Sequence, residues 1–513
     1  MPVSFEIFPS IGISRVGTSS KFFVGPEPNV PLDLVRRDAN GGLLRQAARF
    51  RIYECDRDAN GVLQNAREIP LPEARIEWAV HLVNRKAAAL RFNGGRPTTK
   101  RRNKATGDDS QDRHLIIDPG IKQISNPGEV VQFDGVFGAL PVSLGSAFMQ
   151  SDGRLCVIGG NGTSGGSGKI RNFADNDGWH DDMGDGPVTA SITRGGQTIT
   201  AKPAWVVVAP PDFAPEISNV VTMYDVLFDR AVARGIFPEP PIIFYDRMVR
   251  PILERARNMQ WVNRQARLGY DDTLSGGHGP DGGRGNFDFG ALGDKTTPAA
   301  ARLEVFRLLR DPAEETGPAG VSRRKHMPRL NDDNDTGEVL PLTRQQYRAL
   351  KLWAQGQFET TDPAPPPESE PDAVTRVALQ ACAGAGLFPG IEMGRIVWEP
   401  RIYFPDEAFR FSPEVVRPGE ITGRNAVPWQ ADFWQCRWEE NENLNEQGLG
   451  WWPAQRPDDV LKSAAMDPVP WTRGLEEKND VLVANWHRLG FVKQDPANPG
   501  VFLEQDRDPT LPP

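Results

Sequence analysis

The hydrophobic period of this chain changes once, near residue 215, and that change constrains the fold more than any other feature. Before it, short apolar or alternating runs are bounded by Gly, Pro, Asn and Asp, as in RFRIYECD, RIEWAVHLV, LIIDPG, RLCVIGG and AWVVVAPPDF. Such runs are typical of β-strands. From Asn219, NVVTMYDVLFDRAVARG has apolar residues at helical spacing and ends in glycine, which predicts a helix. We therefore expect an α+β fold with a β-rich N-terminal half and a helical middle.

This pattern divides the 513 residues into four regions, because the chain is too long for one ordinary core. We expect a β-rich domain over 1–215, a mainly helical region over 216–361, a proline-rich acidic linker over 362–374 and an irregular, tryptophan-rich region over 375–513. Further helices are expected in RMVRPILERARNMQWVNRQA, AAARLEVFRLLRDP, TRQQYRALKLWAQGQF and VTRVALQACAG, and a glycine-rich loop over 271–295.

Charge and apolar run length exclude several classes of partner. The net charge of −9 and pI of about 5.4 argue against a nucleic-acid binder, because no broad basic face would neutralise phosphates. No run approaches 18 apolar residues and no basic segment precedes an apolar one at the start, so we expect no membrane span and no signal peptide. A cytoplasmic location is the default expectation, and secretion by a non-classical route stays open.

Two motifs suggest cofactor or metal binding but have simpler interpretations. Residues 160–165 fit GxGxxG, yet the sequence after them favours turns over the helix that a dinucleotide site needs. Residues 179–185, WHDDMGD, contain one histidine and three carboxylates without a second histidine at ligand spacing, so a turn is favoured over a metal site. The four cysteines lie far apart, which argues against a disulfide framework and a CxxC metal site. We expect no metal.

The stretch AVPWQADFWQCRWEENENLNEQGLGWWPAQRP gathers five of the 13 tryptophans around Cys436. The simplest interpretation is a packed core patch, since indoles and free thiols are both readily buried. A reactive site is the alternative. A helical turn over 428–437 would place Asp432 and Cys436 on one face, where the carboxylate could accept a proton while the sulfur attacks an oxidised ring. Spacing alone favours packing.

Longer segments of the sequence favour the reactive site over the packed core patch. These are IFPSIGISRVGTSSKFFVGPE, LLRQAARFRIYE, GWHDDMGDGPVTA, VVVAPPDFAP, KHMPRL, LTRQQYRALKLWAQGQF, LQACAGAGLFPGIE, AVPWQADFWQC and WWPAQRPDD. In these segments, which extend over nearly the whole chain, the sequence resembles the LodA-like class of quinoprotein amino-acid oxidases, which includes L-lysine ε-oxidase and the quinone-dependent glycine oxidase.

The resemblance implies a protein-derived cofactor, cysteine tryptophylquinone, in which a thioether joins a cysteine to a quinone-bearing indole. Cys436 would be the cysteine and Asp432 the carboxylate that assists cofactor formation. Trp451 is the preferred tryptophan, with Trp452 second and Trp486 third, and the shorter spacing from the cysteine here leaves that choice open. A primary amine or amino acid would form a Schiff base with the quinone, and O2 would reoxidise the cofactor, releasing aldehyde or oxoacid, ammonia and hydrogen peroxide.

The resemblance also suggests pocket residues. Phe213 matches a position where glycine oxidases carry Phe and lysine ε-oxidase carries Tyr, so a glycine-oxidase-like substrate is preferred; a buried loop phenylalanine is the alternative. Cys382 and Glu392 match a segment near the family's active site. Glu392 would orient the amine or a base, or would simply pair with an arginine.

Partners follow from the same resemblance. We expect a flavin-dependent monooxygenase to install the quinone oxygens, and a homo-oligomer. Two alternatives stay open. One is a non-catalytic homologue in which Cys436 stays unmodified and the protein has a binding or structural role. The other is an enzyme with the same cofactor that acts on a peptide-borne amine.

Overall fold

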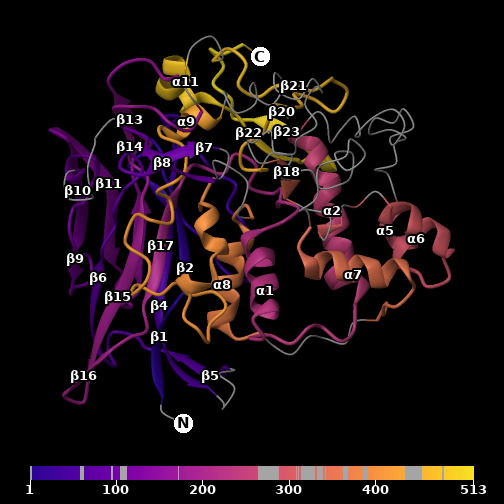
Figure 1. Cartoon of the computed structure of the whole chain (residues 1–513), viewed down its shortest axis with the longest axis horizontal. Helices are drawn as coiled ribbons and strands as arrows, with labels where there is room; N and C mark the ends of the chain where they lie inside the picture. The colour runs from indigo at the N-terminus through magenta and orange to yellow at the C-terminus, as the bar shows by residue number, and fades with distance from the viewer. Residues whose placement is uncertain are drawn as a thin grey trace.

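The computed structural model describes residues 3–57, 63–93, 96–103, 112–171, 173–263, 288–307, 309, 311–312, 330–331, 339–340, 342–361, 368–384, 391–433, 453–475 and 479–512. In this part of the chain, a large β-sheet is built from the N-terminal half and the helices of the middle region lie to one side of it (Figure 1). The β-rich N-terminal half and the helices after it agree with the expectation from hydrophobic period.

The large sheet has 13 strands, and its main path runs β10-β11-β12-β4-β2-β17-β15-β6-β9. Its strands are β1 Ser4–Phe8, β2 Ile11–Arg15, β3 Phe22–Val24, β4 Arg45–Arg57, β5 Leu63–Glu68, β6 Arg75–Val80, β9 Lys122–Ile124, β10 Val130–Phe137, β11 Leu140–Met149, β12 Leu155–Gly159, β15 Asp185–Arg194, β16 Gln197–Thr200 and β17 Ala204–Ala209. Most neighbours are antiparallel, whereas β17 with β2 and β3 with β4 are parallel.

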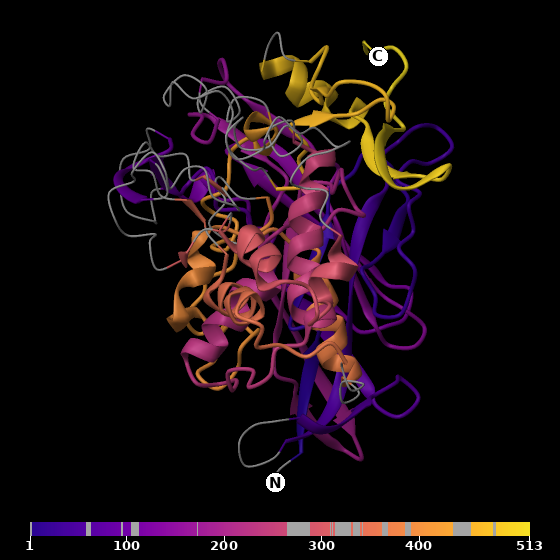
Figure 2. The same cartoon turned by 90° about the vertical axis from the view of Figure 1, so that its right-hand side faces the viewer.

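Five strand pairs lie outside the large sheet. They are β7 Leu90–Asn93 with β8 Arg96–Arg101, β13 Ser164–Gly166 with β14 Trp179–Asp181, β18 Leu330–Asn331 with β19 Val339–Leu340, β20 Asp459–Val460 with β21 Val469–Pro470, and β22 Phe491–Asp495 with β23 Asn498–Gln505. The last pair lies in the C-terminal segment, at the end of the molecule opposite the N-terminus (Figure 2).

The helices are α1 Met223–Ala233, α2 Arg250–Asn258, α5 Phe289–Gly293, α6 Ala299–Phe306, α7 Arg344–Ala354, α8 Glu370–Gln380, α9 Trp429–Asp432 and α11 Asn479–Asn485. Shorter helical turns are Arg113–Leu115, Tyr245–Val249, Met259–Trp261, Arg395–Trp398, Pro400–Ile402 and Trp486–Arg488. Two helices begin at capping boxes, α1 at Thr222 with Asp225 and α7 at Thr343 with Gln346, in which side chain and backbone satisfy each other's hydrogen bonds. No helix among these has the length and hydropathy needed to cross a bilayer.

The centre of the sheet is buried on both faces. Every residue of β2 and of β17 is buried, which explains the continuous apolar run AWVVVA. Alternate side chains of the two strands, such as Ile11 and Trp205, pack against Met223 of α1 and Leu379 of α8. The β17 strand ends at Ala209, so the proline-rich loop after it starts from a rigid edge.

Local elements differ from expectation in three places. LIIDPG forms no strand, because a helical turn ends at Leu115 and Pro119 with Gly120 breaks the extended run after an isolated bridge at Ile117. Helix α5 lies inside the expected loop, with its start stabilised by Asp288, whose side chain accepts from the Ala291 amide. Helix α8 begins inside the expected linker, because the Ser369 side chain caps it.

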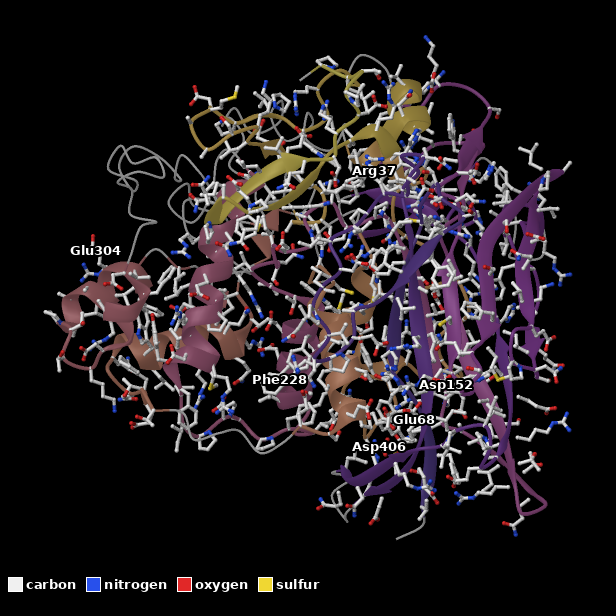
Figure 3. All side chains as sticks on the ribbon, turned by 180° about the vertical axis from the view of Figure 1, so that it is seen from behind. Arg37, Glu68, Asp152, Phe228, Glu304 and Asp406 are labelled. Atoms are coloured by element: carbon white, nitrogen blue, oxygen red, sulfur yellow. The ribbon has the colours of Figure 1, made fainter. Side chains whose placement is uncertain are left out.

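One loop of the N-terminal half reaches the C-terminal segment. Arg37, labelled in Figure 3, donates Nη2 to the Leu489 carbonyl oxygen at 2.9 Å and Nε to the Asp506 carbonyl oxygen at 2.9 Å. The loop around Arg37 is therefore joined to the C-terminal segment by hydrogen bonds to backbone groups.

Candidate functional site

The short helix α9 lies near the start of the tryptophan-rich stretch 426–457, and its residues are buried. It starts after Pro428, as the proline at the head of the predicted helical turn suggested, and the described helix ends at Asp432. The Gln430 side chain fixes α9 to the loop 160–166, because its Nε2 donates to the Gly162 carbonyl oxygen at 3.1 Å and its Oε1 accepts from Ser164 Oγ at 2.7 Å.

That loop is the GxGxxG stretch of the sequence. Strand β13, not a helix, follows its central glycine, so the loop lacks the helix N-terminus that a dinucleotide phosphate needs. Gly162 has φ of +73° and a Cβ there would lie 2.2 Å from the Trp486 ring. Glycine at this position therefore lets Trp486 pack close to the loop that holds α9.

The carboxylates of WHDDMGD hold the framework around α9. Asp181 Oδ2 accepts from Lys86 Nζ at 2.8 Å and from the Trp429 amide at 3.1 Å, and Lys86 also donates to the Ala426 carbonyl oxygen at 3.0 Å. Burial lowers the pKa of Lys86, and the Asp181 carboxylate opposes that shift. Asp185 accepts from Trp205 Nε1 at 2.9 Å and from Thr422 Oγ1 at 2.6 Å.

The expectation of a simple turn in this motif is wrong in part. Trp179–Asp181 forms β14 because it pairs with β13, and Asp185 begins β15, where it pairs with Val207 of β17, so only residues 182–184 lie outside strands. Burial raises the pKa of Asp182 to about 7 and that of Asp185 to about 6. Among the residues that the structure describes, no three or more His, Cys, Asp or Glu side chains are grouped as metal ligands.

Asp432 forms a buried ion pair with Arg456. The Arg456 Nη1 atom donates to Asp432 Oδ2 and, at 2.7 Å, to the Asp432 carbonyl oxygen. The two side chains are only 4% and 5% exposed. Cys436, Trp451 and Trp452 lie in 434–452, outside the described residues. The ion pair therefore joins the two ends of the segment that contains all three.

Phe213 contacts the residue next in sequence to each member of this ion pair, Phe433 after Asp432 and Gln455 before Arg456. Its amide donates to the Gln455 carbonyl oxygen at 3.1 Å, and its carbonyl oxygen accepts from the Val492 amide at 2.7 Å. Its ring is fully buried. The distance from its ring centroid to that of Phe433 is 6.1 Å, to that of Trp471 4.8 Å and to that of Phe491 4.9 Å. The structure thus places Phe213 in contact with residues at both ends of 434–452.

Glu392 pairs with an arginine, which was one of the two interpretations of its sequence position. Its Oε1 accepts from Arg15 Nη2 at 2.7 Å and its Oε2 accepts from the Ala383 amide at 3.1 Å. Burial raises the pKa of Glu392, and the Arg15 guanidinium opposes that shift. The Ala381 carbonyl oxygen accepts from both Arg15 Nη2, at 3.1 Å, and Gln455 Nε2, at 3.0 Å. The Arg15–Glu392 pair is therefore linked by hydrogen bonds to the residue before Arg456.

Cys382 is a buried thiol in the core between the sheet and the helices. Its Sγ donates to the Ala378 carbonyl oxygen at 3.3 Å, and it packs with Ile11 and Leu379. Burial raises the pKa of Cys382 well above its usual range, so the thiol stays protonated at neutral pH. These surroundings suit packing better than nucleophilic chemistry.

Trp486, the third candidate tryptophan, packs against Trp429 with ring centroids 4.8 Å apart.

Sequence reasoning missed Arg456, Gln455 and Arg15. The first two lie in the WWPAQRP stretch but attracted no attention beside its tryptophans. A usable signal was present, because a carboxylate expected among buried indoles needs a cationic partner. Arg15 carried no such local signal, since its partner Glu392 is 377 positions away.

Comparison with known proteins places this geometry in a family. Residues 8–208 match the family model described as L-lysine epsilon oxidase N-terminal, and residues 324–453 match the L-lysine epsilon oxidase C-terminal domain. The curated L-lysine 6-oxidase of Marinomonas mediterranea is 29% identical over 536 residues, which cover 85% of this chain and 71% of that protein.

Solved structures share the fold. The crystal structure of the L-Lys epsilon-oxidase from Marinomonas mediterranea has a TM-score of 0.77 and 23% identity, covering 98% of this chain and 95% of that chain. The Schiff base intermediate of that enzyme with L-Lys gives a TM-score of 0.77 at 22% identity, with the same coverage.

Proposed function

Because this chain belongs to the LodA-like family and is an amino-acid oxidase that uses O2, we propose that it deaminates a primary amine or amino acid with a quinone built from its own side chains. The products would be an aldehyde or oxoacid, ammonia and hydrogen peroxide. The family is known for a protein-derived quinone, and we propose cysteine tryptophylquinone formed from Cys436 and Trp451. Trp452 is the second choice and Trp486 the third.

The observation that carries this proposal is the ion pair between Asp432 and Arg456. It holds together the chain on either side of 434–452. Cys436 is three residues after Phe433 and Trp451 is two residues before Pro453 in the sequence. These short connections to the two sides of the ion pair support a crosslink between Cys436 and Trp451.

The described residues fit this cofactor. When present, the quinone supplies an electrophilic carbonyl that accepts the electrons of the amine. Asp432 offers a buried carboxylate, four residues before Cys436, that would take the thiol proton when the sulfur adds to an indole ring already oxidised by the monooxygenase, with O2 taking up the two electrons that the addition leaves on the ring. Arg456 acts as a positioning residue, because its guanidinium holds the carboxylate in one place and stabilises its negative charge out of water.

The apolar environment of the site comes from aromatic rings. Phe213, Phe433, Trp471 and Phe491 pack against one another beside the ion pair. We propose that Phe213 contributes to the substrate pocket. Its identity is the one feature that favours a glycine-oxidase-like substrate; the comparisons give that preference no support, because their curated relative is an L-lysine 6-oxidase. Lysine and glycine are therefore the two substrates to test first.

Maturation needs two added oxygens on the indole. We propose that a flavin-dependent monooxygenase supplies them and that the mature enzyme is a homo-oligomer.

Peptide mass spectrometry after co-expression with such a monooxygenase tests the cofactor. The expected result is one crosslinked species that contains Cys436 and Trp451, with added oxygen on the indole. Cys436→Ala should abolish it, whereas the matched control Cys156→Ala, in strand β12 of the large sheet, should keep it. Separate, unmodified peptides from the parent protein would contradict the assignment and favour a non-catalytic homologue.

An amine screen for peroxide release then identifies the substrate. Lysine, glycine and small apolar amines are compared with a lysine-containing peptide. Turnover of the peptide alone would favour the alternative of a peptide-borne amine.

A further inference from the structure

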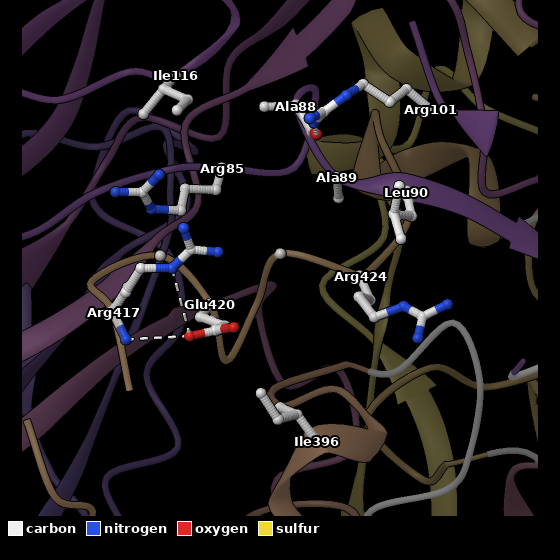
Figure 4. A pocket seen from close by; sticks show the side chains of 12 residues that line it. Arg85, Ala88, Ala89, Leu90, Arg101, Ile116, Ile396, Arg417, Glu420 and Arg424 are labelled. Atoms are coloured by element: carbon white, nitrogen blue, oxygen red, sulfur yellow. Dashed lines mark hydrogen bonds and ion pairs between the residues drawn. The ribbon is translucent and has the colours of Figure 1, made fainter. Parts of the chain in front are cut away.

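The loop 417–424, which precedes α9, lines a hollow of about 350 Å³ (Figure 4). Four arginines line this hollow, and each of them interacts with other groups of the chain. In Figure 4, for example, dashed lines join Arg417 to Glu420, whose Oε2 accepts from the Arg417 amide at 3.0 Å. A buried polar group that lacks a partner lies further along the chain, on α9 itself, at Trp429.

The indole N–H of Trp429 is a buried donor without an acceptor. Trp429 is only 2% exposed, and among the residues that the structure describes no acceptor lies within hydrogen-bond distance of its Nε1. Four other fully buried indoles each donate to an oxygen at 2.9 to 3.0 Å, namely Trp78 to Gly153, Trp205 to Asp185, Trp353 to Leu292 and Trp471 to Gly490. Burial of an unpaired donor is unfavourable, so this N–H calls for an acceptor that the described chain does not supply.

Trp429 belongs to the face of α9 that carries the proposed site. Asp432 and Phe433 follow it at i+3 and i+4, a spacing that places side chains on one face of a helical turn. The rings of Trp429 and Phe433 are in contact, with centroids 5.1 Å apart. Ala431 packs elsewhere, in a cluster with Trp179. The unpaired N–H therefore lies on the side of α9 that bears Asp432.

The orientation of this indole is fixed by its neighbours. Its ring packs edge-on against both Phe433 and Trp486, with interplanar angles of 67° and 69°. Its backbone amide donates to Asp181 Oδ2 at 3.1 Å. A donor held in this way does not have to reorient when an acceptor arrives, which is what makes a hydrogen bond useful in catalysis.

We propose that the Trp429 indole N–H donates a hydrogen bond to an oxygen of the tryptophylquinone. This inference rests on the cofactor proposed above. The two quinone oxygens accept hydrogen bonds, and the aromatic rings around Asp432 offer them no water. A fixed donor at one oxygen draws electron density from the ring, which makes the quinone more electrophilic towards an amine.

Two changes at position 429 test the proposal in protein matured with the monooxygenase. Trp429→Phe removes the N–H and keeps an aromatic ring, and 3-benzothienylalanine at the same position keeps the shape of the indole and replaces only its N–H by sulfur. Mass spectrometry verifies the crosslink first. We expect the quinone carbonyl stretch in the resonance Raman spectrum to move to higher frequency in both variants, and kcat/KM for the best amine to fall about tenfold through loss of one hydrogen bond.

Trp179→Phe is the matched control, because the Trp179 N–H is also buried and unpaired but packs beside Ala431. It should keep the carbonyl frequency and kcat/KM of the parent. The proposal is overturned, while the cofactor stands, if both changes at position 429 leave the carbonyl frequency at the parent value. It is also overturned if kcat/KM falls only for amines that carry a carboxylate, because the N–H would then bind the substrate. Absence of the quinone from the parent protein would overturn the proposed function as well.

Discussion

Two buried arginine–carboxylate pairs with the same chemistry have different places in this molecule. Arg15–Glu392 joins the central strand β2 to a loop 377 positions away, and both Glu392 oxygens are used within the described framework. Arg456–Asp432 joins residues only 24 positions apart, on either side of the segment that contains Cys436. The comparison teaches that pairing alone assigns no role, and that position in the chain is what makes Arg456–Asp432 the candidate site pair and Arg15–Glu392 the candidate framework pair.

Arg15 and Gln455, the residue before Arg456, share one acceptor, because Arg15 Nη2 and Gln455 Nε2 both donate to the Ala381 carbonyl oxygen. The two pairs can nevertheless be separated by experiment. Loss of either pair should reduce stability, whereas only loss of the Asp432–Arg456 pair should also reduce cofactor formation in the molecules that fold.

The largest expected effect is on cofactor formation in Asp432→Ala. Without the carboxylate that accepts the proton, the folded protein should lack the mature quinone, and amine-dependent peroxide production should fall to background. Visible absorbance beside circular dichroism checks this outcome. Arg456→Gln should also reduce the amount of mature quinone, but by less, because the carboxylate is kept and only its position is lost. A normal quinone band in folded Asp432→Ala would remove Asp432 from the site.

Glu392→Ala should instead destabilise the fold. It leaves Arg15 buried without its carboxylate, and breaking one side of a buried pair costs roughly 3–5 kcal/mol. The free energy of unfolding from urea titration checks this value. Glu77→Ala, which breaks an exposed pair with Arg75, is the control and should cost under about 1 kcal/mol. Equal costs in the two variants would show that Glu392 is not a framework residue.

Asp182 is a third buried carboxylate, which differs from Glu392 and Asp432 because neutral groups bond to it instead of an arginine. Its Oδ2 accepts from the Thr163 amide at 3.0 Å and from the Thr163 hydroxyl at 3.3 Å. Burial raises its pKa to about 7. The unfolded chain loses this proton near pH 4 while the folded chain keeps it, so this residue's contribution to stability is full below pH 4 and falls as pH rises to about 7.

Asp182→Asn should remove that fall, which is on the order of a few kcal/mol for a shift of this size. Melting temperatures of parent and variant from pH 4 to 8 measure it. Asp185 titrates in both proteins, so the difference between the two curves reports Asp182. Parallel curves would mean that Asp182 is ionised throughout this range.

The smallest expected effect is that of Phe213→Tyr, which adds a hydroxyl to a ring that packs against Phe433, Trp471 and Phe491. A buried hydroxyl without a partner costs about 1–3 kcal/mol, enough for a tenfold rise in KM if the ring lines the pocket. Steady-state peroxide production with the best amine checks this, and a shift towards amines with a second polar end would support the same role. Unchanged KM, turnover and amine ranking would make Phe213 a packing residue.

Local patterns in the sequence predicted much of the fold. The runs that became β4, β12 and β17, and the helical spacing of α1 and α7, depend on neighbours within a few residues. Among the expected strands, LIIDPG was an exception, because this apolar run pairs with no strand. Asp432 could be singled out because the tryptophan-rich stretch resembles a known family. Its bond to Arg456, and that of Arg15 to Glu392, could not, because those contacts depend on how distant segments approach in the folded chain.

The ion pair at the ends of 434–452 also has a kinetic consequence. If Cys436 and Trp451 are the crosslinked pair proposed above, the bond between Asp432 and Arg456 would make their reaction depend on an effective concentration instead of the concentration of protein in solution. Crosslinking should then be first order in protein, with the same rate constant in dilute and concentrated samples. Folding would thereby determine which indole the thiol meets before any oxygen has been added to the ring.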